Sequence, residues 1–277
     1  MFGAPVSIAT TSSYLLPREH GAWGIVLIPF LTAVAIPGRL TPAVGLTLAA
    51  VLLAFIARYP LELLLVPELY RRAGSPPRAR ARRLAWAYGL AASALGVLLV
   101  AGWKLYLLLP VGLLAALFFL FHLWAGRRSS DRSWGAELLG TTGLTLSGLA
   151  GWIAATGTLN QTGLLVWWLN CVFFCAGIVY VKSRLRSRLA VHRPELQQAT
   201  HFMLGFHAAV VVFVLALVYL RWVSPLILLP FGVAAARAGW GARRTGQPFA
   251  LRRLGWSEVI HSVVFAALLV LAFRTAG

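Results

Sequence analysis

The stretch TGLLVWWLNCVFFCAGIVYV occupies residues 162–181 and contains no charged side chain. A helix needs about 20 apolar residues to cross the hydrocarbon core of a bilayer, because each residue adds about 1.5 Å and the core is about 30 Å thick. The basic run KSRLRSR follows directly at residues 182–188. This order predicts a transmembrane helix whose basic end faces the cytoplasm.

The composition extends this prediction to the whole chain. Its 277 residues are 60% hydrophobic and only 12% charged, and the mean hydropathy is +0.80. Soluble domains carry about 25% charged and about 45–50% apolar residues. A water-soluble fold of this size could not bury so much apolar surface, so the bilayer must be the solvent. The composition therefore excludes a soluble enzyme, a secreted domain and a disordered tail.

Apolar runs bounded by proline, glycine and arginine predict an all-α fold, a polytopic membrane helix bundle with about nine transmembrane helices. Neither a repeat nor a soluble domain interrupts the pattern, so we expect a single integral membrane domain over residues 1–277. The expected helices are 22–37, 42–66, 84–102, 105–124, 137–157, 162–181, 200–220, 224–240 and 256–273.

The distribution of positive charge predicts how the chain is threaded. Lysine and arginine total 25 against seven acidic residues, which gives a net charge of +18. If the N-terminus is cytoplasmic, 21 basic residues fall on the cytoplasmic side and only Arg39, Lys104, Arg221 and Arg274 fall outside. The positive-inside rule then predicts a multi-pass cell-membrane protein with its N-terminus cytoplasmic and its C-terminus outside. Because these residues lie in short connections between apolar runs, we expect no nucleic-acid partner.

The first group of candidate functional residues lies at the start of the first helix. Arg18, Glu19, His20 and Trp23 place a cation, a carboxylate, an imidazole and an indole within six residues, directly before an apolar run. Such residues beside a membrane helix are costly and therefore become candidates for function. They could form the wall of a polar pocket, in which His20 changes charge near neutral pH. Alternatively, they anchor the helix at the interface.

Two further groups follow the second and sixth predicted helices. Arg58 and Glu62 are four residues apart and could pair on one helix face, either as a structural ion pair or facing a ligand. In the other group, Lys182 and Arg186 would share one face. That group could be ordinary positive-inside charge or an anion site, because guanidinium matches phosphate geometry. Its candidate pocket residues are Tyr180, Lys182, Arg184 and Arg186, and Arg188, His192 and Arg193 complete the group.

Other polar residues of the apolar runs predict packing and no metal site. Glu258 and His261 form a single E-x-x-H pair, which is insufficient for a di-metal bundle. Cys171 and Cys175 are interpreted as small packing residues. Gly143, Ser147 and Gly151 repeat every four residues, a stripe that lets a neighbouring helix approach closely. We expect no bound metal and no cofactor.

The stretch PREHGAW, residues 17–23, which leads into IVLIPF at residues 25–30, resembles the signature of YwiC-like proteins. These are bacterial integral membrane proteins, and the resemblance covers nearly the whole chain. More remotely, GAELLG at residues 135–140 and GLAGW at residues 148–152 are similar to the segment that opens helix five in the UbiA superfamily of intramembrane prenyltransferases. The latter resemblance implies nine helices and a central cavity that opens to cytoplasmic loops.

The chain departs from the UbiA pattern where that family binds Mg²⁺ and a diphosphate through two aspartate motifs. The first motif position reads RYPLE at residues 58–62, and the second reads VKSRLRSR at residues 181–188, without a carboxylate. Asp131 is the only aspartate in the chain. The UbiA-like fold is therefore expected without the family's metal site or catalytic residues.

These observations predict a YwiC-like membrane protein that binds an anionic amphiphile in a cytoplasm-facing cavity, with a membrane lipid or an isoprenoid-like molecule as partner. They leave open whether the chain catalyses a reaction. One alternative is a divergent UbiA-type prenyl transferase or another intramembrane transferase. The other is a non-catalytic membrane component that binds a partner protein.

Overall fold

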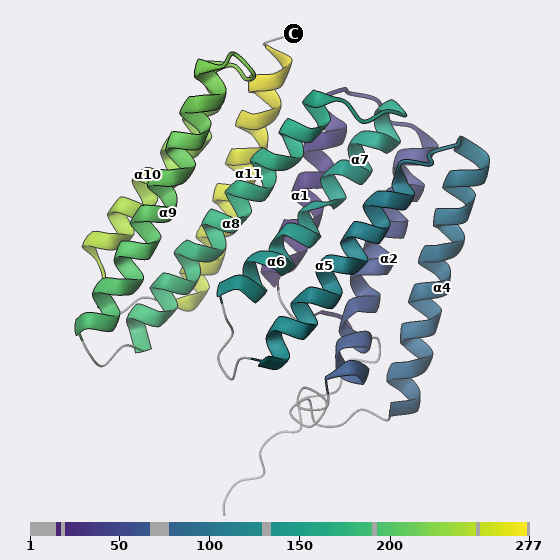
Figure 1. The fold of residues 1–277 in the computed structure, drawn as a ribbon, viewed down its shortest axis with the longest axis horizontal. Coiled ribbons are helices and arrows are strands. Elements are labelled where there is room, and N and C mark those ends of the chain that lie inside the picture. The colour runs from purple at the N-terminus through teal and green to yellow at the C-terminus, as the bar shows by residue number, and fades with distance from the viewer. Residues whose placement is uncertain are drawn as a thin grey trace, which may run out of the picture.

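The computed structural model describes residues 15–17, 20–66, 78–128, 134–189, 193–247 and 250–275, and every regular element in these ranges is a helix (Figure 1). The helices are α1 (His20–Ala35), α2 (Pro42–Leu65), α4 (Arg78–Trp103), α5 (Leu108–Arg128), α6 (Trp134–Thr145), α7 (Ser147–Thr156), α8 (Gln161–Leu189), α9 (Arg193–Tyr219), the short 3-10 helix η1 (Pro225–Ile227), α10 (Leu228–Arg243) and α11 (Leu251–Arg274).

The predicted polytopic helix bundle is confirmed. Within the described residues, eight spans are long and apolar enough to cross a membrane, and the shorter apolar helix Gly21–Ala35 makes a ninth. Several helices extend past the predicted ends: α4 begins at Arg78 and α8 continues to Leu189. The added turns are rich in arginine, which is a good helix former whose charged end can reach water beyond the apolar layer.

The fifth predicted span, 137–157, consists of two helices, α6 and α7, which meet at Leu146. Next to this junction, the hydroxyl of Thr145 donates to the carbonyl oxygen of Thr142 at 2.9 Å. The hydroxyl of Ser147 donates to Val26 O of α1 at 2.7 Å. Threonine and serine hydroxyls that bond backbone carbonyls bend helices, and here they satisfy polar groups inside the bundle.

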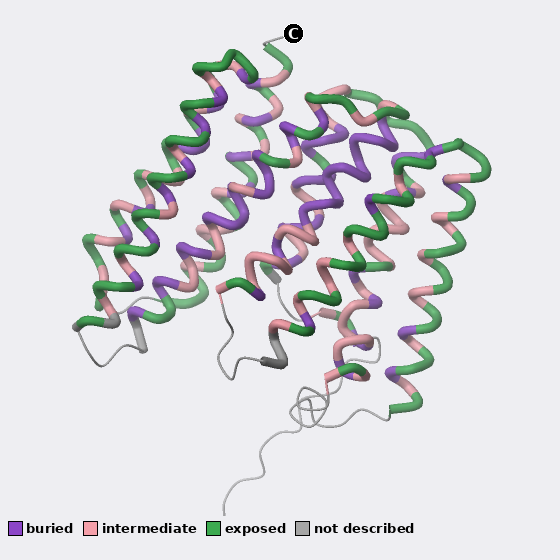
Figure 2. The backbone as a smooth tube through the Cα atoms, in the orientation of Figure 1, coloured by how far each residue is buried: buried purple, intermediate pink, exposed green. Residues whose placement is uncertain are grey.

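Helices α1, α7 and α8 form the middle of the bundle, as the burial colours show (Figure 2). Every residue of α7 from Ser147 to Ala155 is buried. In the apolar segment of α6 and α7 (Trp134–Thr156), 67% of the residues are buried. In the apolar segment of α4 (Arg78–Trp103), only 11% are buried. The outer helices therefore expose leucine and other apolar side chains to the space that lipid occupies in a bilayer.

The glycines of α7 allow α1 to approach closely. A Cβ at Gly148 would lie 3.2 Å from the backbone oxygen of Pro29, and one at Gly151 would lie 2.9 Å from that of Phe30. Gly143, further along the stripe in α6, lies against Phe118 of α5, whose Cβ would be 2.8 Å from an added Cβ. The packing role predicted for the small-residue stripe is thus confirmed.

The helices alternate in direction, so the described basic residues divide between the two ends of the bundle. Arg39, Lys104 and Arg221 closely follow the last residues of α1, α4 and α9, and Arg274 ends α11. Figure 1 places these four helix ends at the same end as the C-terminus, called here the opposite end. The starts of α1, α4, α6, α9 and α11 form the basic end, which carries the remaining basic residues.

Replacing Gly151 by alanine tests the close contact between α1 and α7. We expect Gly151→Ala to destabilise the protein by about 1–3 kcal/mol, because the new methyl group overlaps the Phe30 backbone oxygen. Gly96→Ala is the matched control, since a Cβ at Gly96 meets nothing within 4 Å. The unfolding midpoint of each variant is measured by thermal unfolding in detergent. Equal unfolding midpoints for the two variants would contradict the packing described here.

Candidate functional site

Helix α8 divides its ionisable side chains between two faces. Successive residues of an α-helix are rotated by about 100°, so residues four apart share a face and residues two apart point to nearly opposite sides. Lys182 and Arg186 face α6, whereas Tyr180 and Arg184 face α10. The face predicted to be shared by Lys182 and Arg186 is confirmed.

The face toward α6 carries what we call the Trp134 site, formed by Trp134, Glu137, Lys182 and Arg186. The ammonium of Lys182 lies 3.1 Å from a carboxylate oxygen of Glu137. The ammonium of Lys182 and the guanidinium of Arg186 each lie 4.9 Å from the ring centre of Trp134. The ring of Phe202 from α9 contacts the same indole, with centroids 4.7 Å apart. Two cations therefore share one aromatic platform.

On the other face, Arg184 closes the end of α10. Its guanidinium is buried and donates to the carbonyl oxygens of Gly241 at 3.0 Å and Arg244 at 2.8 Å. The last carbonyls of a helix lack partners in the helix and carry partial negative charge, so a cation stabilises them. The guanidinium of Arg184 therefore has a structural role. The four predicted α8 residues lie on two different faces of the helix and do not form one anion site together.

A third polar cluster joins α8, α10 and α11. The guanidinium of Arg237 lies 4.0 Å from the ring centre of Tyr180, forms an ion pair with Glu258 and donates to the hydroxyl of Ser257 at 3.2 Å. His261 Nδ1 lies 3.0 Å from the backbone oxygen of Ser257. Glu258 therefore holds Arg237, and no group of three metal-binding side chains occurs among the described residues.

The predicted pair on α2 is present. Arg58 Nε lies 2.5 Å from Glu62 Oε1, and both side chains are largely buried. Trp23 packs edge-on against Phe55 of α2 with centroids 4.9 Å apart, and its indole N–H donates to Pro17 O at 3.4 Å.

The structure does not bring all the predicted residues into one group. Helix α2 packs mainly on α4 and α7, whereas α6, α9 and α10 pack on α8, so the α2 pair and the α8 residues belong to different parts of the bundle. Arg18, Glu19 and the side chain of His20 lie outside the described residues.

Arg237 and Trp134 were not among the functional candidates predicted from the sequence. Another missed polar contact lies deep in the bundle, where Asn170 of α8 is fully buried and donates to Thr32 Oγ1 of α1 at 3.1 Å. Arg237 and Asn170 could have been identified from the sequence, because a strongly polar residue inside an apolar run needs a partner. The identity of each partner depends on helix packing.

The ion pair between Arg237 and Glu258 can be tested with a double-mutant cycle. Arg237→Leu or Glu258→Leu alone leaves one charge unpaired between helices, so each single variant should be destabilised. The double variant should lose less stability than the sum of the two single losses. We expect a coupling energy of about 1–3 kcal/mol by thermal unfolding. Additive losses would show that the two side chains do not interact.

Comparison with known proteins finds one family and one curated relative that are similar to this chain. Residues 16–151 match the model of the YwiC-like protein family. The chain is 25% identical over 268 residues to "Uncharacterized protein YwiC" of Bacillus subtilis (strain 168), which covers 93% of this chain and 97% of that protein. No solved structure matches, so the UbiA-like arrangement stays a prediction. By these matches the chain is similar to YwiC-like proteins, and its apolar helices make it a multi-pass membrane protein.

Proposed function

We propose that the protein binds an anionic amphiphile at the Trp134 site. The observation that carries this proposal is the placement of Lys182 and Arg186 over one indole, at the point where the apolar run of α8 ends. Tryptophan prefers the headgroup layer of a bilayer, where its ring is apolar and its N–H can reach water. With the predicted threading, this layer belongs to the cytoplasmic leaflet.

The two cations have different local partners. Glu137 forms an ion pair with Lys182, but none of the described carboxylates forms an ion pair with Arg186. Arg186 is also exposed. A guanidinium that stacks on an aromatic ring still presents its N–H groups at the edge. Those donors match two oxygens of a phosphate or carboxylate. Arg186 is therefore the residue we expect to bind the headgroup.

Exposed apolar side chains lie close to this headgroup position. Phe202 contacts Trp134 and is 42% exposed, and Leu185, which precedes Arg186 in α8, is also exposed. A hydrocarbon chain that follows a headgroup on Arg186 would cover these side chains and gain stability from the buried apolar area. The combination of a cation, an aromatic platform and an apolar surface fits an amphiphile better than a small soluble anion.

Long-range electrostatics favour the same ligand. The whole chain carries 25 basic and seven acidic residues, a net charge of +18, and most of the described basic residues lie at the basic end. Each of the three acidic side chains that the structure describes is occupied by an ion pair. Such a surplus attracts anionic lipid by about 1 kcal/mol per basic residue near the surface.

Substitution of Arg186 tests this function. The purified protein in phosphatidylcholine nanodiscs is titrated with phosphatidylglycerol, and bound lipid is counted by native mass spectrometry. We expect Arg186→Gln to weaken phosphatidylglycerol binding about tenfold, because a charge-assisted hydrogen bond is lost. Trp134→Ala should weaken it in the same direction by releasing the guanidinium.

Arg39→Gln is the matched control, since Arg39 is an exposed arginine at the opposite end. It should retain wild-type binding. If Arg186→Gln binds phosphatidylglycerol as the wild type does, or if the wild type does not prefer it to phosphatidylcholine, the proposal is wrong. The partner-binding alternative would then explain the family better.

A further inference from the structure

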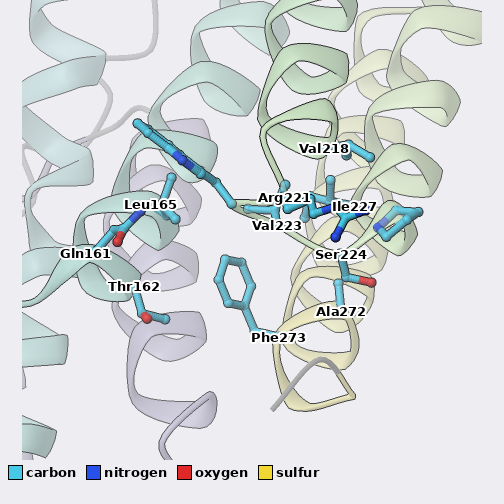
Figure 3. Close-up of a pocket in the computed structure, with 12 residues that line it drawn as sticks. Gln161, Thr162, Leu165, Val218, Arg221, Val223, Ser224, Ile227, Ala272 and Phe273 are labelled. Carbon is cyan, nitrogen blue, oxygen red and sulfur yellow. The ribbon is translucent and has the colours of Figure 1, made fainter.

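A cavity of about 970 Å³ lies at the opposite end of the bundle, far along α8 from the Trp134 site (Figure 3). The start of α8 forms one side, and the segment from the end of α9 to η1 forms another. Phe273 of α11 lies between them (Figure 3). Sites for small molecules and cofactors enclose about 300–1,000 Å³, so this cavity is large enough for part of a lipid.

The lining changes from apolar and buried to polar and exposed. The inner part consists of Leu165, Val223, Ile227 and Ala272, all of which are buried, with Ile227 at 0% and Ala272 at 1% exposure. The outer part is exposed or half-buried and contains the polar side chains of Gln161, Thr162, Arg221 and Ser224 together with Trp222. This gradient matches an amphiphile whose chain enters first and whose headgroup stays at the mouth.

Arg221 carries the only charge among the described residues that line the cavity. It follows the end of α9 in a turn in which Arg221 N donates to Val218 O at 2.9 Å and Trp222 N donates to Leu217 O at 3.0 Å. This is the helix-ending turn in which glycine is usual. The φ angle of Arg221 is +56°, a left-handed conformation that strains residues with a side chain. The chain therefore carries an arginine at the cavity mouth, although glycine would adopt this backbone conformation without strain.

The electrostatics at this end favour an anion. The three acidic side chains that the structure describes, Glu62, Glu137 and Glu258, all belong to helix ends at the basic end, and none of them pairs with a basic residue of the opposite end. The exposed Trp222 beside Arg221 is typical of the headgroup layer.

We propose that this cavity binds a phospholipid with an anionic headgroup, taken from the leaflet at the opposite end of the bundle. The headgroup lies at Arg221, and an acyl chain covers the inner apolar residues beside Phe273. This site is separate from the Trp134 site and does not depend on it, because the two lie at different ends and share no residue.

The test uses phosphatidylglycerol with a photoreactive diazirine in its acyl chain, present in phosphatidylcholine nanodiscs that contain the full-length protein. Labelled peptides are identified by mass spectrometry. We expect labelling of the peptides that contain Leu165, Ile227 and Phe273. Excess unlabelled phosphatidylglycerol should compete, and added phosphatidylcholine should not.

Arg221→Gly should reduce this labelling about tenfold through loss of the charged donor, while thermal stability stays equal or rises because the left-handed strain is removed. Arg221→Lys should retain most of the labelling. Lys104→Gly is the matched control, because Lys104 is the other opposite-end cation with positive φ, at +57°, and does not line the cavity.

Peptides from the Trp134 site report on the other proposal in the same experiment, and their labelling should be unchanged by Arg221→Gly. The cavity proposal is overturned if the cavity peptides stay unlabelled, if a phosphatidylcholine probe labels them equally, or if Arg221→Gly labels like the wild type. Equal losses in Arg221→Gly and Lys104→Gly would overturn it as well.

Discussion

An ionised or strongly polar side chain is stable among membrane helices only when another group satisfies it, and this constraint orders the bundle. Each described carboxylate meets a cation: Glu62 within α2, Glu137 across α6 and α8, and Glu258 across α10 and α11. Asn170 reaches Thr32 in the same way. Because lipid tails are as apolar as the helix surfaces, the hydrophobic effect does not favour one helix neighbour over another, and such pairs act together with close packing to specify which helices meet.

Helix α8 is the element through which most of these contacts pass. Its buried apolar part packs among α1, α7 and α9, and its basic part contacts α6 on one face and α10 on the other. The α6-facing cations both lie over the ring of Trp134, whereas the guanidinium of Arg184 donates to backbone carbonyls. Similar residues two positions apart therefore have different roles, because helical rotation gives them different neighbours.

The sequence alone predicted the number of apolar helices, their approximate positions and the contacts that arise within one helix. The Arg58–Glu62 pair and the common face of Lys182 and Arg186 follow from a repeat of 3.6 residues per turn. The pairs Glu137–Lys182 and Arg237–Glu258 could not be predicted, since they depend on which helices pack together. The cavity at the opposite end was missed for the same reason, because its lining comes from three separate segments.

The threading of the chain through the membrane decides which leaflet each proposed lipid site faces. Cysteine accessibility tests this threading most directly. Cys171 and Cys175 are buried and would be replaced by serine. Single cysteines would then be introduced as Arg39→Cys at the opposite end and Arg82→Cys at the basic end, both exposed positions. A membrane-impermeant maleimide should label Arg39→Cys in intact cells, and Arg82→Cys only after the membrane is permeabilised. The reverse pattern would contradict the account.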